Sequence, residues 1–184
     1  FHAPLIISQH TMLSISQAAS PSIRNRLVTK LARLFFRYAD AAICVSQGVA
    51  EDFIDIIGMP RQKTHVVYNP LVSPALEQNA QESISHPWFT AGAPPVILAV
   101  GRLTVAKDYP TLLHAFSLVC RKRPARLIIL GDGLERVRLE ALIKELGVLD
   151  YVQMPGFVNN PYVYMKRARL LVLSSKWEGL PSVL

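Results

Sequence analysis

The clearest indication of the fold comes from Pro94-Pro-Val-Ile-Leu-Ala-Val-Gly-Arg-Leu-Thr-Val-Ala-Lys107. Val96–Val100 is an unbroken apolar run, which is typical of a strand buried on both faces of a parallel sheet. Gly101 ends this strand, and Arg102 and Lys107 place two cations just beyond it. Ligands of open α/β sheets bind beyond the carboxyl ends of the strands, so these features predict a site for a phosphate-bearing ligand.

A helix start follows at Asp108-Tyr-Pro-Thr. The sequence predicts that Asp108 caps this helix and that Pro110 occupies its first turn, where a missing N–H costs little. The amino terminus of a helix attracts anions, so it would reinforce the two cations.

Strands and helices alternate along most of the chain, which predicts doubly wound parallel α/β sheets. Strands are expected at 4–10, 41–46, 64–68, 96–100, 127–130, 151–154 and 170–173, and helices at 22–38, 47–57, 109–121, 134–146 and 161–167. Residues 71–93 lack clear periodicity and are interpreted as a linker between domains at 1–70 and 94–184. The chain starts without Met and stops where a helix begins, so we expect a part of a longer protein.

Composition narrows the possible partners. The 184 residues are 51% hydrophobic and carry a net charge of +7, which favours a globular core and an anionic partner. The cations form no long run and accompany no nucleic-acid motif, so nucleic acid is not expected as a partner.

No apolar run has the roughly 18 residues of a membrane-spanning helix. Cys44 and Cys120 are expected to be free thiols in a reducing, cytoplasmic compartment.

Three further features each fit two interpretations. Gly131-Asp132-Gly133 ends the next strand at the same sheet edge, either as a tight turn with glycines at positive φ or as a ligand contact. Glu178 follows the last expected strand, as an exposed loop residue or as a group that recognises hydroxyls. His10 ends the first strand, where a structural role is more common than a catalytic one.

The expected helix at 22–38 has two distinct faces. Its apolar face is predicted to pack on the core and contains Leu27, Val28, Leu31, Leu34, Phe35 and Tyr38. Its basic face contains Arg26, Lys30, Arg33 and Arg37 and is either solvated or bound to anionic lipid headgroups.

Several chemistries find no support in the sequence. The histidines and cysteines show no metal-ligand spacing, and no P-loop or G-x-S-x-G motif is present. Gly131-Asp-Gly133 is not the dinucleotide-binding fingerprint, so an NAD-dependent dehydrogenase is not expected. Neither a bound metal nor a protein nucleophile is predicted.

In this order, the motifs resemble those of the family 4 retaining glycosyltransferases of the GT-B fold. The resemblance covers nearly the whole chain and rests on Val100-Gly-Arg-Leu103 with Lys107, Asp108–Phe116, Leu127–Gly133, Pro155–Val158 and Ser174–Pro181, together with Ile43–Ser46 and Val66–Pro70. It implies two Rossmann-like domains, of which this chain contains a fragment of both.

The resemblance implies a role for each candidate residue. Arg102 and Lys107 match the pair that grips the donor diphosphate, and Glu178 matches the first of two glutamates, near the donor sugar. His10 matches, less closely, a histidine that reaches the transferred sugar. The remaining expected donor-site residues are Gly101, Gly131, Asp132, Gly156, Phe157 and Val158.

The resemblance also implies an activity. We expect a sugar to move from a nucleotide diphosphate donor, UDP-linked, to a glycan or lipid-linked acceptor in surface polysaccharide assembly. Retention would proceed by front-face attack without a metal, in the cytoplasm or at the inner face of the membrane. The second glutamate would fall two positions beyond Leu184, and the acceptor loop lies outside the chain. The alternatives are a nucleotide-sugar epimerase of the same fold, which the Arg–Lys pair disfavours, and a non-catalytic nucleotide-sugar-binding protein.

Overall fold

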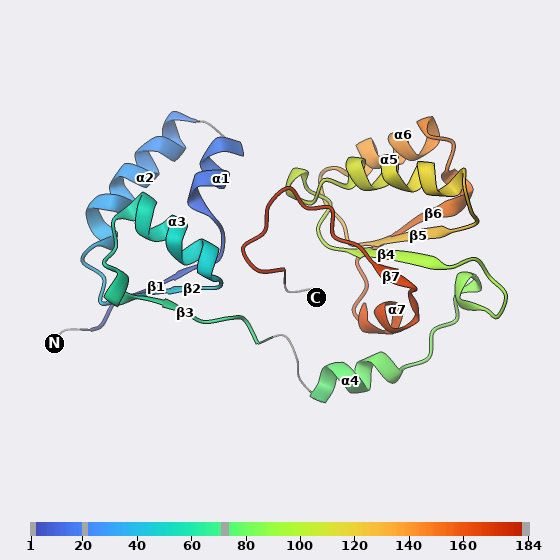
Figure 1. Ribbon diagram of the computed structural model, residues 1–184, viewed down its shortest axis with the longest axis horizontal. Coiled ribbons are helices and arrows are strands. Elements are labelled where there is room, and N and C mark those ends of the chain that lie inside the picture. Colours follow the sequence, from blue (N-terminus) through green and yellow to red (C-terminus); the bar gives the residue numbers. More distant parts are fainter. Residues whose placement is uncertain (1–2, 20–21, 71–73, 182–184) are drawn as a thin grey trace. The chain divides into compact units, whose positions relative to one another are not determined.

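The computed structural model describes residues 3–19, 22–70 and 74–181. These residues form two compact units (Figure 1). The first unit contains residues 3–70 together with 177–181, and the second contains residues 74–176.

The second unit is built on a four-stranded parallel sheet in the order β6-β5-β4-β7. The strand predicted at 96–100 is confirmed as β4 (Val96–Val100), which pairs with β5 (Arg126–Leu130) and β7 (Leu170–Leu171). Strand β6 (Val152–Gly156) pairs with the outer side of β5. All four strands run parallel, so their carboxyl ends meet at one edge.

Helices cover both faces of this sheet, as expected for a doubly wound fold. Helices α5 (Tyr109–Cys120) and α6 (Arg136–Glu145) lie on one face and α7 (Tyr162–Arg167) on the other (Figure 1). Side chains on the two sides of β5 enter separate cores. Leu127 and Ile129 pack under α5 and α6, whereas Ile128 and Leu130 belong to the core beside α7.

The stretch interpreted as a linker is partly helical. It contains α4 (Pro74–Gln81) and the short 3-10 helix η2 (Pro87–Phe89). Lys166 and Arg167 of α7 donate hydrogen bonds to Gln81 and Glu82, and Trp88 and Phe89 pack on the core beside α7. Residues 74–93 are therefore part of the second unit, and residues 71–73 lie outside the described ranges.

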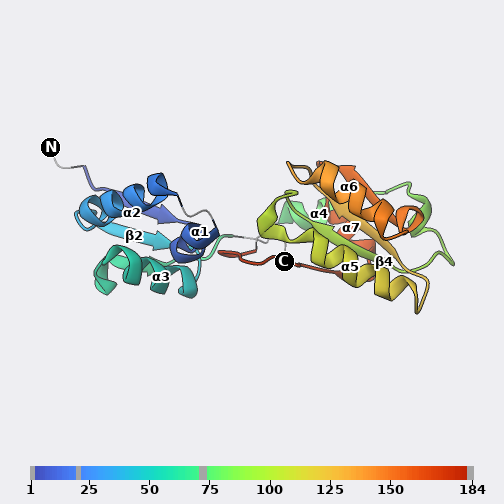
Figure 2. The ribbon, with the colours of Figure 1, turned by 90° about the horizontal axis from the view of Figure 1, so that it is seen from above.

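The first unit contains a three-stranded parallel sheet in the order β1-β2-β3. The strands are β1 (Ile6–Gln9), β2 (Ala41–Cys44) and β3 (Thr64–Val66), and the helices are α1 (Leu13–Ala19), α2 (Ile23–Phe36) and α3 (Gln47–Ile57). Helix α1 was not expected from the sequence. Figure 2 shows the same elements from above.

The strands of the first unit are buried mainly on one face of their sheet. The helices of the first unit share one core with Ile7, Ala42 and Cys44, which point to one face of the sheet. On the other face, Ile6 and Val67 are more than half exposed. Among the described residues no element covers this face, so these strands are buried on one side rather than on two.

The face of α2 that contacts the core also differs from the prediction. Ala32 and Phe36 pack on the core of the first unit, and the Phe36 ring stacks on Phe53. The six residues of the predicted apolar face are instead between 45% and 68% exposed. At 3.6 residues per turn, α2 has two apolar stripes, the predicted one and a second one that contains Ala32 and Phe36. Because Ala32 is small, the second stripe lets α2 approach α3 more closely than the predicted stripe would.

Helix α3 follows the prediction at both ends. The Ser46 hydroxyl accepts a hydrogen bond from the Val49 amide, and Gly58 ends the helix in the left-handed conformation. Within the helix, the buried Asp52 carboxylate accepts hydrogen bonds from the amides of Leu13 and Ser14. Asp52 thereby caps α1 from a position 39 residues away.

Two glycine turns pack backbone against backbone at the carboxyl edge of the second sheet. A Cβ atom on Gly131 would lie 2.1 Å from the Gly101 carbonyl oxygen, and one on Gly133 would lie 2.4 Å from the Leu103 carbonyl oxygen. Gly131 also has a φ of 133°, which favours glycine. The tight-turn interpretation of Gly131-Asp-Gly133 is thus confirmed.

Both cysteines are free thiols. Burial raises the pKa of Cys44 and of Cys120, although the nearby Arg126 charge opposes the shift at Cys120. Within the described ranges, no helix is both long and apolar enough to cross a membrane.

Replacing Asp52 tests the cap on α1. Asp52→Ala leaves the Leu13 and Ser14 amides without an acceptor, so we expect a loss of about 1–2 kcal/mol in the free energy of unfolding. Asp55→Ala is the matched control, because Asp55 lies on the same helix and is exposed. Denaturant titration measures both, and equal stability of the two variants would contradict the cap.

Replacing Gly131 tests the contact between the two turns. Gly131→Ala forces a methyl group against the Gly101 carbonyl oxygen, and we expect a loss of about 2–4 kcal/mol in the free energy of unfolding. Gly48→Ala is the control, because a Cβ at Gly48 meets no atom within 4 Å. Its stability should stay within about 1 kcal/mol of the parent. A Gly131→Ala protein as stable as the control would show that the turns can separate freely.

Candidate functional site

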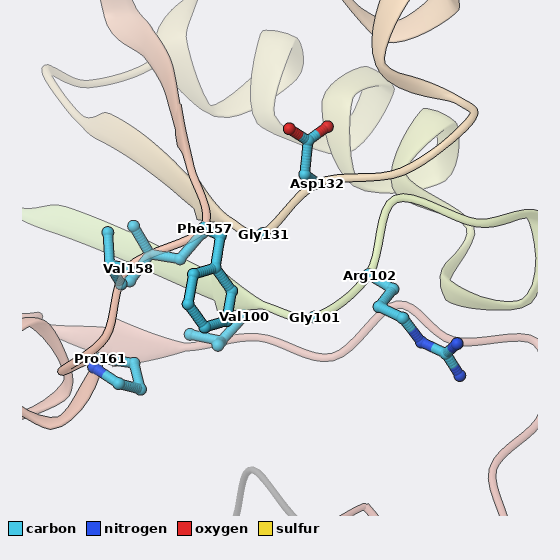
Figure 3. Close-up of a pocket in the computed structure, with 9 residues that line it drawn as sticks. Val100, Gly101, Arg102, Gly131, Asp132, Phe157, Val158 and Pro161 are labelled. Carbon is cyan, nitrogen blue, oxygen red and sulfur yellow. The ribbon is translucent and has the colours of Figure 1, made fainter.

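A cavity of about 300 Å³ lies at the carboxyl edge of the second sheet (Figure 3). It is formed where the segments after β4, β5 and β6 come together. The lining residues are Val100, Gly101, Arg102, Leu130, Gly131, Asp132, Phe157, Val158 and Pro161. All of these except Val100, Leu130 and Pro161 were expected from the sequence to be donor-site residues. Two of those three are the last residues of their strands and precede the glycine turns.

The cavity has an apolar part and a charged margin. Phe157 is 78% exposed, so a face of its ring is available to a planar ligand. The Arg102 guanidinium extends away from Phe157 (Figure 3). Arg102 is exposed and forms no ion pair within the described ranges. A ligand with a flat apolar group and an anionic group would match this arrangement.

The structure brings Lys107 to the turn that carries Arg102. Lys107 ends the short 3-10 helix η3 (Val105–Lys107), within a segment that we call the Lys107 loop (residues 104–108). A Cβ atom on Gly101 would lie 3.1 Å from Lys107 Cε, so the lysine side chain lies over this glycine. The Tyr109 hydroxyl donates a hydrogen bond to the Gly101 carbonyl oxygen at 3.1 Å. Both predicted cations therefore lie next to the same turn.

The predicted capping role of Asp108 is wrong. Asp108 precedes α5, but its side chain caps no backbone amide of the helix. Its carboxylate accepts a hydrogen bond from the Thr111 hydroxyl and lies 3.7 Å from the Lys176 ammonium. Asp108 has a φ of 46°, a left-handed conformation that costs a non-glycine residue about 1–3 kcal/mol. With that backbone, the carboxylate reaches the Thr111 hydroxyl in the first turn but no backbone amide of the helix.

Asp132 is held by its own turn. Its carboxylate accepts a hydrogen bond from the Gly133 amide at 2.7 Å and lies 3.9 Å from Arg136. Arg136 also donates to the Met154 carbonyl oxygen, so it links the turn after β5 to β6. Arg136 was not among the residues expected from the sequence, although its four-residue spacing from Asp132 at a helix start was an available signal.

The three candidates at the end of β6 and just beyond it have different positions. Phe157 and Val158 line the cavity, whereas Gly156 does not. Gly156 has a φ of 92°, and its carbonyl oxygen accepts a hydrogen bond from the Gly131 amide at 2.8 Å. Gly156 therefore holds the turns after β5 and β6 together.

Glu178 and His10 belong to the first unit. Gly179, which follows Glu178, packs closely on the backbone of His10, since a Cβ on Gly179 would lie 1.9 Å from the His10 carbonyl oxygen. The His10 ring shares a hydrogen bond of 2.8 Å with the Ser8 hydroxyl. Leu180 packs on the core of the first unit. The residue that follows Glu178 therefore contacts His10 directly, and the roles of Glu178 and His10 stay predictions.

The described residues contain no group of three or more His, Cys, Asp or Glu side chains that could hold a metal ion.

Comparison with known families covers both units. Residues 80–184 match the family described as Glycosyl transferases group 1, and residues 1–72 match the one described as Glycosyltransferase Family 4.

Curated relatives extend over most of the chain. An N-acetylgalactosamine-N,N'-diacetylbacillosaminyl-diphospho-undecaprenol 4-alpha-N-acetylgalactosaminyltransferase from Campylobacter jejuni is 34% identical over 95% of this chain. The lipopolysaccharide core biosynthesis glycosyltransferase LpsE from Rhizobium meliloti is 30% identical over 82% of it. The chain spans 47% and 42% of these relatives, less than half of their length.

Solved structures show the same fold. HepE from Anabaena, in complex with UDP and glucose, is 24% identical and has a TM-score of 0.72 over 98% of this chain and 49% of its own. WaaG, a glycosyltransferase involved in lipopolysaccharide biosynthesis, is 16% identical and has a TM-score of 0.76 over 97% of this chain and 52% of its own. The predicted GT-B fold class is confirmed. With residues 80–184 matched to its family, the chain belongs to the glycosyl transferases group 1.

Proposed function

We propose that this protein transfers a sugar from a UDP-linked donor to a glycan or lipid-linked acceptor, with retention, during surface polysaccharide or glycolipid assembly. Two curated relatives support the class of reaction, because one is an N-acetylgalactosaminyltransferase and the other acts in lipopolysaccharide core biosynthesis. The complex of HepE with UDP and glucose supports UDP as the nucleotide.

One observation carries this proposal. Arg102 and Lys107 are two cations that follow β4. Both lie beside a turn that lines a cavity, and this cavity has an exposed aromatic ring. A nucleoside diphosphate has the matching chemistry, with a flat base for Phe157 and two phosphates for the cations. The base would occupy the apolar part of the cavity and the phosphates its charged margin.

The proposed catalytic effect follows from charge. When the bond between sugar and phosphate breaks, negative charge develops on the departing diphosphate, and cations fixed in advance stabilise it. Arg102 and Lys107 supply these cations, so the reaction needs no divalent metal. The acceptor hydroxyl attacks from the side of the leaving group, and a donor phosphate oxygen takes up its proton. Glu178 and His10 contact the donor sugar in this scheme.

The role of the two cations predicts a large loss of activity on their removal. Arg102→Ala and Lys107→Ala should each lower kcat for release of UDP by about 10²–10³-fold, as when a preorganised donor is lost from an oxyanion site. The assay uses the full-length protein, a panel of UDP-sugars and a metal chelator throughout.

Arg138→Ala is the matched control, because Arg138 is an exposed cation on α6 paired with Glu135. It should retain the activity of the parent. Full activity in both Arg102→Ala and Lys107→Ala would refute the diphosphate assignment. UDP binding by calorimetry without turnover of any donor would instead indicate a non-catalytic nucleotide-sugar-binding protein.

We also propose that α2 contacts an anionic membrane surface. Its exposed apolar stripe includes Phe35 and Leu31, which are 60% and 45% exposed. Around the helix, the stripe formed by Arg26, Lys30, Arg33 and Arg37 lies between this apolar stripe and the side that contacts the core. Arg33 also donates to the Ile56 carbonyl oxygen. Exposed apolar side chains next to cations favour an interface with anionic lipid headgroups.

The lipid contact predicts binding that depends on salt and on Lys30. The full-length protein should bind vesicles that contain anionic lipid, and the affinity should fall at least several-fold between 50 and about 300 mM salt. Lys30→Glu should weaken binding further, whereas Lys144→Glu, an exposed control on α6, should not. Co-sedimentation measures both. Equal binding to neutral vesicles, or no effect of salt, would reject the proposal.

A further inference from the structure

The Lys107 loop is tied at three points to the segment that follows β7, residues 172–176. The Ser174 hydroxyl donates a hydrogen bond to the Lys107 carbonyl oxygen at 2.7 Å. The Lys176 amide donates to the Ala106 carbonyl oxygen at 2.8 Å. The Lys176 ammonium lies 3.7 Å from an Asp108 carboxylate oxygen. Two contacts involve the backbone, and the third is an ion pair between side chains.

The Asp108 carboxylate joins two elements through this ion pair. One oxygen accepts the Thr111 hydroxyl at 2.9 Å within α5, and the other faces Lys176. The Asp108 side chain is 16% exposed, whereas Lys176 is 50% exposed. Such a partly exposed pair contributes little to stability by itself. The pair does join the Lys107 loop to the segment after β7.

The backbone at Asp108 shows that the loop is held against its preference. Among the described residues, Asp108 is the one non-glycine residue with positive φ. Side chains other than glycine keep this conformation when surrounding contacts fix it. The left-handed turn separates η3 from α5 at the point where the Lys107 side chain turns back over Gly101. Position 108 thus sets the course of the backbone directly after Lys107.

We propose that Asp108 and Lys176 are positioning residues that fix the Lys107 ammonium for departure of the diphosphate. This inference rests on the glycosyl transfer proposed above. The attraction of Lys107 for the diphosphate increases as the sugar bond breaks, so an ammonium held in advance needs no rearrangement during that step. A loosened loop still binds the donor through the cavity and Arg102, and it loses the effect on the transition state.

The test is steady-state kinetics on the full-length protein with its UDP-sugar. Asp108→Asn and Lys176→Met should each lower kcat about ten-fold, with the donor KM changed by no more than about two-fold. The double variant should also lose about ten-fold rather than a hundred-fold, because the two side chains act as one unit. Lys176→Arg should retain most of the activity.

Two further variants separate the carboxylate from the backbone. Asp108→Gly adopts the left-handed turn without strain and removes the carboxylate, so it should show the same loss as Asp108→Asn. Arg138→Met, which removes an exposed cation from an ion pair elsewhere in the same unit, should match the parent. An Asp108→Gly protein with full kcat would overturn the proposal, as would losses that multiply in the double variant or appear in KM.

Hydrogen exchange of the backbone amides reports the tie independently of turnover. In Asp108→Asn and Lys176→Met, the amides of the Lys107 loop and of residues 174–176 should exchange faster together. Unchanged exchange would overturn the tie, whatever the enzyme does. If the parent turns over no UDP-sugar while exchange responds as expected, the proposed function is refuted and the structural tie stands. The positioning role is then refuted together with the proposed function, because there is no transfer step for Lys107 to assist.

Discussion

Strand β4 is constrained on every side, and the second unit is arranged around it. Its backbone pairs with β5 and β7, and its side chains enter the cores on both faces of the sheet. Neither edge nor face of the strand can shift without exposing apolar surface or unpairing backbone groups. The chain leaves the sheet at Gly101, directly after β4. The residues that follow therefore start from a fixed position, as the residues of a binding site must.

The sequence was most informative where one local signal dominates. The continuous apolar run predicted β4 to the residue, and the helix expected at 47–57 has the bounds of α3, because the residues that begin and end a helix act within a few positions. Position 108 could not be predicted in the same way. Aspartate before a helix normally indicates a cap, and here the left-handed backbone redirects its carboxylate toward a lysine 68 positions later.

Helix α2 shows a second limit of prediction from sequence. Periodicity identified the helix but could not decide which of two apolar stripes contacts the core, because that choice depends on how closely Ala32 lets α2 approach α3. Likewise, candidate residues for the site could be predicted from the sequence, whereas the hydrogen bond from Arg136 to the Met154 carbonyl oxygen could not. Both contacts depend on elements that the sequence places only approximately. The cations at the end of β4 needed no such information, since they follow the strand directly.

The glycines at this edge differ in what surrounds them. A side chain at Gly101 would meet the flexible end of Lys107 and the Tyr109 hydroxyl, whereas one at Gly131 or Gly133 would meet carbonyl groups of the main chain. No exchange of a neighbouring side chain moves a carbonyl oxygen, and none relieves the positive φ of 156° at Gly101. In a genetic selection, second-site changes in neighbouring side chains should therefore fail to suppress substitutions at any of the three glycines.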